Sequence, residues 1–521
     1  MAEVNKELKK LRELNLQLSR ENELLRQKLD VLARKIFGKS SEQLDRNQLQ
    51  LLLEGANPVG KCESDDLETS DESSPSTRPR KRRKSRKESL PENLPTEEII
   101  LIPDEVQKDP SLYREIAEEV SEKLDYDPAQ FRRIITRRKK FVKRSASFDD
   151  LEQFFIAPLP PSLKERSILT PRLAAEIASN RFCYHLPYYR QEQMFLTRHG
   201  VHLARNTMSQ WIGDLASQYL TGIYNAMHEK MLSETYLQAD ETPIEYLEPG
   251  HGSTKKGYLW TLSRPDLHAD DGRGDIFFQW HASRANDCLL KLLSTREQNF
   301  IGVLQCDGYS AYETYQQKAD AIDLIGCWAH VRRKFYEARA YKPYISTWII
   351  KQIQNLYAIE SKLRKQRASP VERERIRLVE SLPIYRRLEK ALKMLVTKRK
   401  VLPQSNLGKA IHYALGQWDK LERCFFDGRL EIDNNLIENG IRPTKLGAKN
   451  WLFMGSHDAA QTNAIWYTLI ESARRRKVDP WHYLVWLFTE LPKIKVTKDT
   501  FAQYTPEAYA RLQHHSQRKA S

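Results

Sequence analysis

Cysteine is scarce in this chain of 521 residues, where six cysteines lie far apart without paired spacing. That pattern excludes a disulfide scaffold and favours a reducing compartment, the cytoplasm. No stretch approaches the roughly 18 apolar residues of a membrane span, so no membrane partner is expected. The N-terminus is a charged helix with spaced leucines, which argues against a secretory signal.

Acidic residues are also in deficit, because 69 aspartates and glutamates face 84 lysines and arginines. The resulting net charge of +15 is typical of chains that meet polyanions, nucleic acid first. Hydrophobic residues amount to 40%, so some polar, poorly folded length is expected. At roughly 150 residues per domain, the chain should hold three or four folded units.

Residues 4–36 carry a heptad pattern in which eight of ten a and d positions are apolar. This pattern predicts a coiled-coil oligomerisation segment over 1–45, and with it a homo-oligomer. Asn15 and Asn22 are the two polar seam positions, which cost stability but fix register and partner number. The alternative is a single amphipathic helix packed on its own protein.

Two charged segments follow. Residues 55–96 divide into an acidic and a basic block and predict a charged disordered linker, and whether its basic block (78–88) touches DNA stays open. Residues 97–160 predict a small basic module, in which 131–144 alternates bases with apolar residues as a strand or ribbon would. The bases expected to contact DNA there are Arg132, Arg133, Arg137, Arg138, Lys139 and Lys140.

Residues 161–225 predict helices throughout, including two joined by a turn at Arg198–Gly200. The second helix carries small polar residues near its start, as in a helix-turn-helix DNA-binding region. An ordinary helical hairpin is the alternative. Residues of this segment expected to contact DNA are Arg205, Asn206, Thr207 and Gln210.

From residue 235 the pattern changes to short apolar runs bounded by turn residues, which are typical of strands. Strands are expected at 236–239, 257–262, 276–280, 300–306 and 322–327, with a helix at 285–293. This order predicts an α/β domain over 235–455 with a sheet of mixed direction. Residues 328–425 are almost all helix formers, and 456–521 predict a C-terminal helical region.

Three acids carry the candidate chemistry. Asp240 and Asp307 each follow a predicted apolar strand directly, at the sheet edge where ligands of open α/β sheets gather. Together with Glu438 they could neutralise two Mg²⁺ ions, which activate a nucleophile and stabilise the leaving oxygen in phosphodiester displacement. Plain turn chemistry is the alternative for Asp307 and the glycine after it. Bases that follow Glu438 and are expected to position phosphates are Arg442, Lys445 and Lys449.

Long motifs in a fixed order resemble those of transposases of the insertion sequence 66 family, a group of bacterial DDE transposases. The likeness covers nearly the whole chain. The motifs are Leu32–Glu42, Leu186–Glu192, Ala239–Pro243, Gln305–Tyr309, Gly326–Phe335, Asp427–Glu438, Ile441–Pro443, Asn450–Phe453 and Asp479–Pro480.

The resemblance implies an RNase H-like catalytic domain whose DDE triad is Asp240, Asp307 and Glu438, with two Mg²⁺ ions that Mn²⁺ can replace. Glu438 lies 131 positions after Asp307, so the helical run 328–425 resembles an insertion. Cys327 and His330 belong to a family motif, which favours a helix beside the active site over a zinc site. Arg332 and Arg333 of this helix could approach DNA; a buried structural role is the alternative.

One departure from the family pattern concerns zinc. Members usually carry a cysteine-rich zinc-binding module after the linker, whereas 97–160 contains no cysteine, so a degenerate module without zinc is expected. Recognition of the terminal inverted repeats by this module is therefore open, and the basic run 131–144 could act through phosphates instead.

The sequence thus predicts a Mg²⁺-dependent DNA transposase that binds transposon ends and catalyses nicking and strand transfer. Its partners would be the terminal inverted repeats, target DNA and accessory proteins of the same element. It would act in the cytoplasm, associated with the nucleoid when bound to DNA. The alternative is a catalytically decayed, transposase-derived DNA-binding protein.

Overall fold

The computed structural model describes residues 161–520, with gaps at 166, 249, 267–272, 319–320, 340–341, 399 and 495–496. Before these it describes only 131, 134, 140–141 and 155–156, where β1 (Lys140–Phe141) and β2 (Phe155–Ile156) pair in antiparallel fashion. The predicted coiled coil, the linker and most of the basic module therefore lie outside the described residues. All described helices and strands belong to one compact unit.

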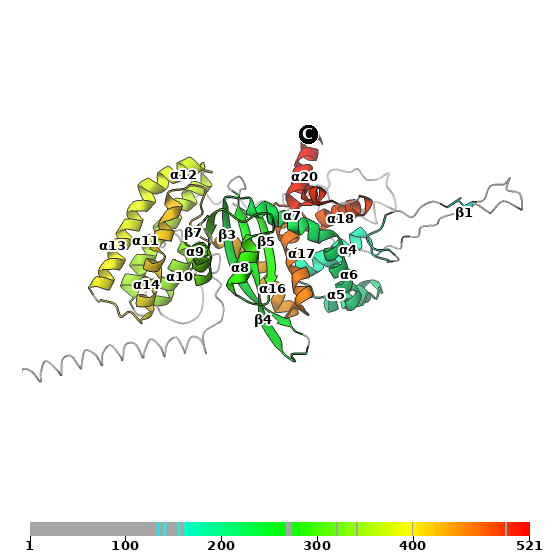
Figure 1. Cartoon of the computed structure of the whole chain (residues 1–521), viewed down its shortest axis with the longest axis horizontal. Coiled ribbons are helices and arrows are strands. Elements are labelled where there is room, and N and C mark those ends of the chain that lie inside the picture. The colour runs from blue at the N-terminus through cyan, green and yellow to red at the C-terminus, as the bar shows by residue number, and fades with distance from the viewer. Residues whose placement is uncertain are drawn as a thin grey trace, which may run out of the picture. The chain divides into compact units, whose positions relative to one another are not determined.

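A five-stranded sheet lies at the centre of this unit (Figure 1). Its strands are β3 (Tyr236–Leu247), β4 (Thr254–Pro265), β5 (Arg273–His281), β6 (Gly302–Gln305) and β7 (Ile322–Ile325). The order is β5-β4-β3-β6-β7, antiparallel from β5 to β3 and parallel from β3 to β7. This confirms the α/β class and the mixed sheet that the sequence predicted.

Strand β3 is longer than predicted. The apolar run predicted a strand ending at Ala239, but β3 continues to Leu247 because β4 pairs with it as far as Leu247↔Thr254. Asp240 therefore lies inside β3, opposite Thr261, and not after its end. Pairing with the parallel neighbour β6 stops at Gln238↔Gln305, so Asp240 lies just beyond the parallel part of the sheet.

Helices from both ends of the described chain share one core. The Phe182 ring stacks on Trp466 at 5.5 Å, and the Trp466 indole donates to the carbonyl of Ile212. The predicted regions 161–225 and 456–521 thus pack together, and α17 also covers β5 through Ser472. The helices are α4 (Pro171–Phe182), α5 (Tyr188–His199), α6 (Arg205–Leu215), η3 (Ala216–Leu220), α7 (Thr221–Leu232), α17 (His457–Arg475), α18 (Pro480–Glu490), η6 (Leu491–Lys493), α19 (Lys498–Phe501), η7 (Ala502–Tyr504) and α20 (Pro506–Ala520). No helix in this described part is long and apolar enough to cross a membrane.

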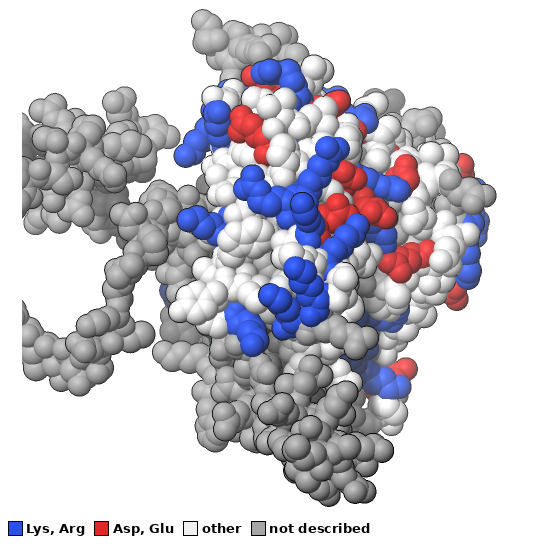
Figure 2. Space-filling model, turned by 90° about the vertical axis from the view of Figure 1, so that its left-hand side faces the viewer, with Lys and Arg blue, Asp and Glu red and all other residues white. Residues whose placement is uncertain are grey.

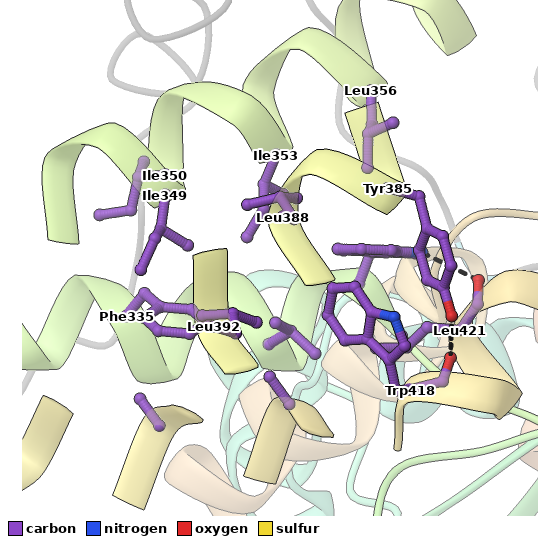
Figure 3. Close-up of a cluster of buried hydrophobic side chains, with 14 of the residues drawn as sticks. Phe335, Ile349, Ile350, Ile353, Leu356, Tyr385, Leu388, Leu392, Trp418 and Leu421 are labelled. Atoms are coloured by element: carbon purple, nitrogen blue, oxygen red, sulfur yellow. Dashed lines mark hydrogen bonds between the residues drawn. The ribbon is translucent and has the colours of Figure 1, made fainter. Parts of the chain in front are cut away.

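Residues 328–425 form a helical lobe between β7 and the helix that carries Glu438 (Figure 1). Leucines and aromatic residues of its helices meet in a buried core, where Tyr385 stacks on Trp418 at 4.6 Å and donates to its carbonyl (Figure 3). The remaining helices are α8 (Asn286–Leu293), α9 (Ser310–Lys318), α10 (Trp328–Ala338), α11 (Pro343–Lys365), α12 (Pro370–Ile376), η4 (Arg377–Ser381), α13 (Leu382–Thr397), α14 (Asn406–Gly416), α15 (Trp418–Glu422), η5 (Arg423–Phe425) and α16 (Asn435–Trp451).

Candidate active site

The two candidate aspartates lie near each other in the register of two parallel strands, Asp240 within β3 and Asp307 two residues beyond the end of β6. Gln238 of β3 pairs in register with Gln305 of β6, and Asp240 and Asp307 each follow two positions later. Because side chains alternate along a strand, each aspartate is expected to share a face with the glutamine before it. The repeated Gln-x-Asp pattern therefore places both carboxylates at one edge of the sheet.

The two glutamines bind the segment that leads to Glu438. The Gln238 amide donates to Gln305 at 2.8 Å and to the carbonyl of Asp433 at 2.9 Å. The Gln305 amide donates to the carbonyl of Glu431 at 2.8 Å. Both glutamines are fully buried, so these bonds replace contacts with water that the amides lost on folding.

Helix α16 starts against the sheet and brings Glu438 to the same edge. The buried Asn434, just before its first residue, donates from its side chain to the carbonyl of Ala239 at 3.1 Å. Glu438 lies in the first turn, where the helix dipole favours a negative charge. The hydrogen bond from Asn434 to Ala239 thus holds the start of the Glu438 helix next to Asp240 in β3.

Helix α10 approaches the site from the lobe, as its sequence predicted. Cys327, just before the helix, accepts a hydrogen bond from the backbone of Asn434, and the His330 imidazole lies 3.8 Å from the Glu438 carboxylate. Cys327 therefore contacts the backbone, while His330 is the nearest described base to Glu438. Arg332 is half-buried and Arg333 is exposed on the same helix.

A second acid of β3, Glu241, has a basic partner, although burial still raises its pKa. Arg284 donates to Glu241 at 2.7 Å, and its guanidinium lies 3.7 Å from the centre of the Tyr309 ring. Tyr312 also donates to Glu241, at 3.1 Å. These contacts connect β3 to the turn that holds Asp307, whose carboxylate accepts from the Tyr309 backbone at 2.9 Å.

The electrostatics differ for Asp240. Its pKa lies well above the ordinary value because burial disfavours the charged form and because Glu241, Glu438 and Asp307 add negative charge around it. No described lysine or arginine forms an ion pair with Asp240, Asp307 or Glu438. All three side chains are only partly buried, so a ligand can reach them. Among the described residues, no three acidic, imidazole or thiol groups lie close enough together to form a finished metal site.

The predicted phosphate-binding bases of α16 follow Glu438 along one stripe. Arg442, Lys445 and Lys449 lie four, seven and eleven positions later, spacings that return to one face of a helix. Arg442 and Lys449 are exposed, whereas Lys445 donates to the carbonyl of Pro243. Burial and the nearby Lys256 lower the pKa of Lys445.

The predicted helix-turn-helix segment has its turn at Gly200, where a φ of +65° suits glycine. In α6, Met208 and Trp211 face the core, whereas Arg205, Asn206 and Gln210 are exposed and Thr207 is half-buried. Lys140 lies in β1; the other predicted bases of the module (Arg132, Arg133, Arg137, Arg138 and Lys139) lie outside the described residues.

Comparison with known families places the chain in a class of DNA-rearranging proteins, the transposases. Residues 166–462, more than half of the chain, match the family model described as Transposase IS66 family. The chain belongs to this family, which confirms the resemblance carried by its motifs. Residues 24–99 match a second model, described as Transposase C of IS166 homeodomain.

Relatives of similar length come from Sinorhizobium fredii (strain NBRC 101917 / NGR234). Uncharacterized protein y4qI is 36% identical over 73% of this chain and 68% of its own length. Uncharacterized protein y4jD is 31% identical over 74% of each. Their names state no activity, so they support the family and leave the reaction to be argued from the site.

Proposed function

We propose that the chain is a DNA transposase with an RNase H-like catalytic domain. Its main support is the register of β3 and β6, in which Asp240 and Asp307 each follow one of two paired glutamines by two positions. Asn434, four residues before Glu438, also binds the carbonyl of Ala239, next to Asp240. Membership of the transposase family supports DNA as the substrate. The reaction would be hydrolysis of a phosphodiester at each transposon end, followed by attack of the freed 3′ hydroxyl on target DNA.

The three acids fit divalent metal ions in chemistry and charge. Their donors are carboxylate oxygens, which Mg²⁺ and Mn²⁺ prefer, and the negative charge that raises the pKa of Asp240 has no described cation to balance it. Two Mg²⁺ ions, when bound, would stabilise negative charge on the attacking and leaving oxygens. Asp240 and Asp307 would hold the metal ions jointly, and Glu438, steadied by His330, would complete the set.

The remaining residues would hold DNA. Arg442 and Lys449 on the exposed stripe of α16 would position phosphates beside Glu438, and Lys445 would join them if it left Pro243. The exposed start of α6 would contact the terminal inverted repeats through Arg205, with Asn206 and Gln210. An N-terminal coiled coil would bring two copies together so that both transposon ends are held in one complex.

The substitution Asp307→Asn tests the site, because it removes one charge and hardly changes the shape. With duplexes that carry the inverted repeats flanking the gene, Mg²⁺-dependent cleavage should fall below detection while DNA binding stays within about twofold, as expected when a residue acts only on the reaction. The matched control is Asp419→Asn, at an exposed position of α15.

Full cleavage by Asp307→Asn would refute the assignment of the triad. Binding without cleavage by the wild-type protein, with Mg²⁺ or Mn²⁺, would instead favour a decayed, transposase-derived DNA-binding protein. A joining assay with a target plasmid then separates a transposase from a nuclease that only cuts.

A further inference from the structure

The net positive charge of the chain lies in the helical lobe. Residues 328–425 contain 23 lysines and arginines and 8 aspartates and glutamates, a net charge of +15. The rest of the chain holds 61 residues of each sign and has no net charge. The lobe contributes none of the three candidate catalytic acids, and in the described structure none of its lysines or arginines forms an ion pair with them.

The outer face of α13 carries a dense group of these bases. The opposite side of the helix packs Leu388 and Leu392 into the lobe core, in the spacing of an amphipathic helix. The α13 face consists of four exposed bases within eight residues, Arg386, Arg387, Lys390 and Lys393. Figure 2 views the molecule from the side of the lobe and shows lysines and arginines spread over this side.

Few acids in the described part of the chain pair with the α13 face. In the part of the chain that the structure describes, Lys393 pairs with Glu389 at 2.6 Å, and no ion pair involves Arg386, Arg387 or Lys390. Arg386 and Lys390 lie four positions apart, where like charges repel and weaken a helix. A helix that keeps such charges together gains stability when a polyanion lies against it.

We propose that the α13 face is a binding surface for duplex DNA, held through its phosphates. Arg386 and Lys393 are about 10 Å apart along the helix axis, a length over which duplex DNA carries roughly six phosphate charges. Phosphate contacts carry no sequence information, so this surface binds DNA of any sequence, as target DNA requires. The choice of DNA as the polyanion rests on the proposed transposase function, but the surface itself is independent of the catalytic triad.

The experiment compares two triple variants of the full chain that remove equal charge from the same lobe. The first carries Arg386→Gln, Arg387→Gln and Lys390→Gln. The control carries Lys351→Gln, Lys362→Gln and Lys365→Gln at exposed positions of α11. These three lysines span about 21 Å along the helix axis. Binding to a fluorescent duplex of random sequence is measured by anisotropy against salt concentration, with a chelator present so that no cleavage occurs.

For the α13 variant, the slope of log affinity against log salt should become shallower by about 2–3, and affinity at moderate salt should fall on the order of 100-fold. The control should change the slope by less than about 1. Circular dichroism and melting temperature should match the wild type for both variants. An unchanged slope for the α13 variant, or an equal change in the control, would overturn the proposal. Because no metal ion or cleavage enters the measurement, a failure of the triad would not affect it.

Discussion

The helical lobe and the sheet edge treat acidic side chains in opposite ways. In the lobe, Arg377 donates to both oxygens of the buried Glu360, at 2.7 and 2.8 Å, and Arg373 bridges Glu360 and Glu431. Burial alone would raise the pKa of Glu431, but Arg364 and Arg373 outweigh burial and lower it. At the sheet edge Asp240 has no such partner among the described residues, and burial and the neighbouring carboxylates raise its pKa.

Compensation therefore distinguishes the two clusters more clearly than burial does. We call the lobe cluster closed because its buried acids are paired with arginines. The carbonyl of Glu431 also accepts a hydrogen bond from Gln305, which fixes the position of this segment. The edge cluster gathers carboxylates without a lysine or arginine partner for Asp240 among the described residues, so a proton or an added cation must balance its charge. The first cluster positions the chain before Glu438, and the second holds the acids that we propose to be catalytic.

The largest effect is expected from breaking the closed cluster. Arg377→Met leaves Glu360 buried with fewer partners and removes the donor to the carbonyls of Cys424 and Asp427. We expect a loss of about 3–5 kcal/mol in the free energy of unfolding, measured by urea denaturation. The control Lys393→Met breaks an exposed pair and should cost less than about 0.5 kcal/mol. Equal losses would contradict the distinction between the clusters.

A smaller loss of stability is expected at Gln305, which connects the lobe cluster to the sheet edge. Gln305→Met removes the donor to Glu431 and the acceptor of Tyr236, and it leaves Gln238 with the carbonyl of Asp433 as its remaining acceptor. We expect a cost of about 2–3 kcal/mol. Because this segment leads to Glu438, the cleavage rate at saturating DNA should fall while DNA affinity is unchanged. The control Gln316→Met loses one bond, to Ile322, and should keep the cleavage rate. A loss of affinity with an unchanged rate would exclude a positioning role.

The smallest effects should have opposite signs. In chelator at pH 7, Glu431→Gln should lower stability by about 1–2 kcal/mol, because charged hydrogen bonds are lost. Asp240→Asn should raise the melting temperature slightly, because it removes an unbalanced charge.

The lowered pKa of Glu431 means that its stabilisation is present above the ordinary carboxyl pKa and is lost as pH falls through the folded value. The deficit of Glu431→Gln should therefore shrink below about pH 4. Losses of equal size in both variants would show that Asp240 is compensated too.

Local patterns predicted much of the fold. Apolar runs located all five strands of the mixed sheet, and the third acid was expected in the helix that now begins at Asn435. The end of β3 was missed because β4 pairs with a stretch that contains polar residues and Pro243, which no apolar run marks. The sequence also contains a repeated Gln-x-Asp pattern at Gln238 and Gln305. This pattern predicts a shared site only once the two strands are known to pair in that register.

The partners of the site could not be predicted in this way. Glu241 and Arg284 are 43 residues apart, and Gln305 and Glu431 are 126 residues apart. Nothing in the spacing of such residues indicates which base reaches which acid. For the same reason the sequence reveals the net positive charge of the chain, whereas the exposure of bases on α13 depends on how that helix packs.

By itself, the sequence determined the family, the order of strands and helices, the three candidate acids and the excess of positive charge, because each depends on residues that are neighbours along the chain. Only the tertiary structure decided that Arg284 pairs with Glu241 while Asp240 has no basic partner among the described residues. It also decided that the buried acids of the lobe are paired while Arg386 and Lys390 are exposed. Charge compensation acts through space over a few ångströms, so it is settled only when distant segments pack together.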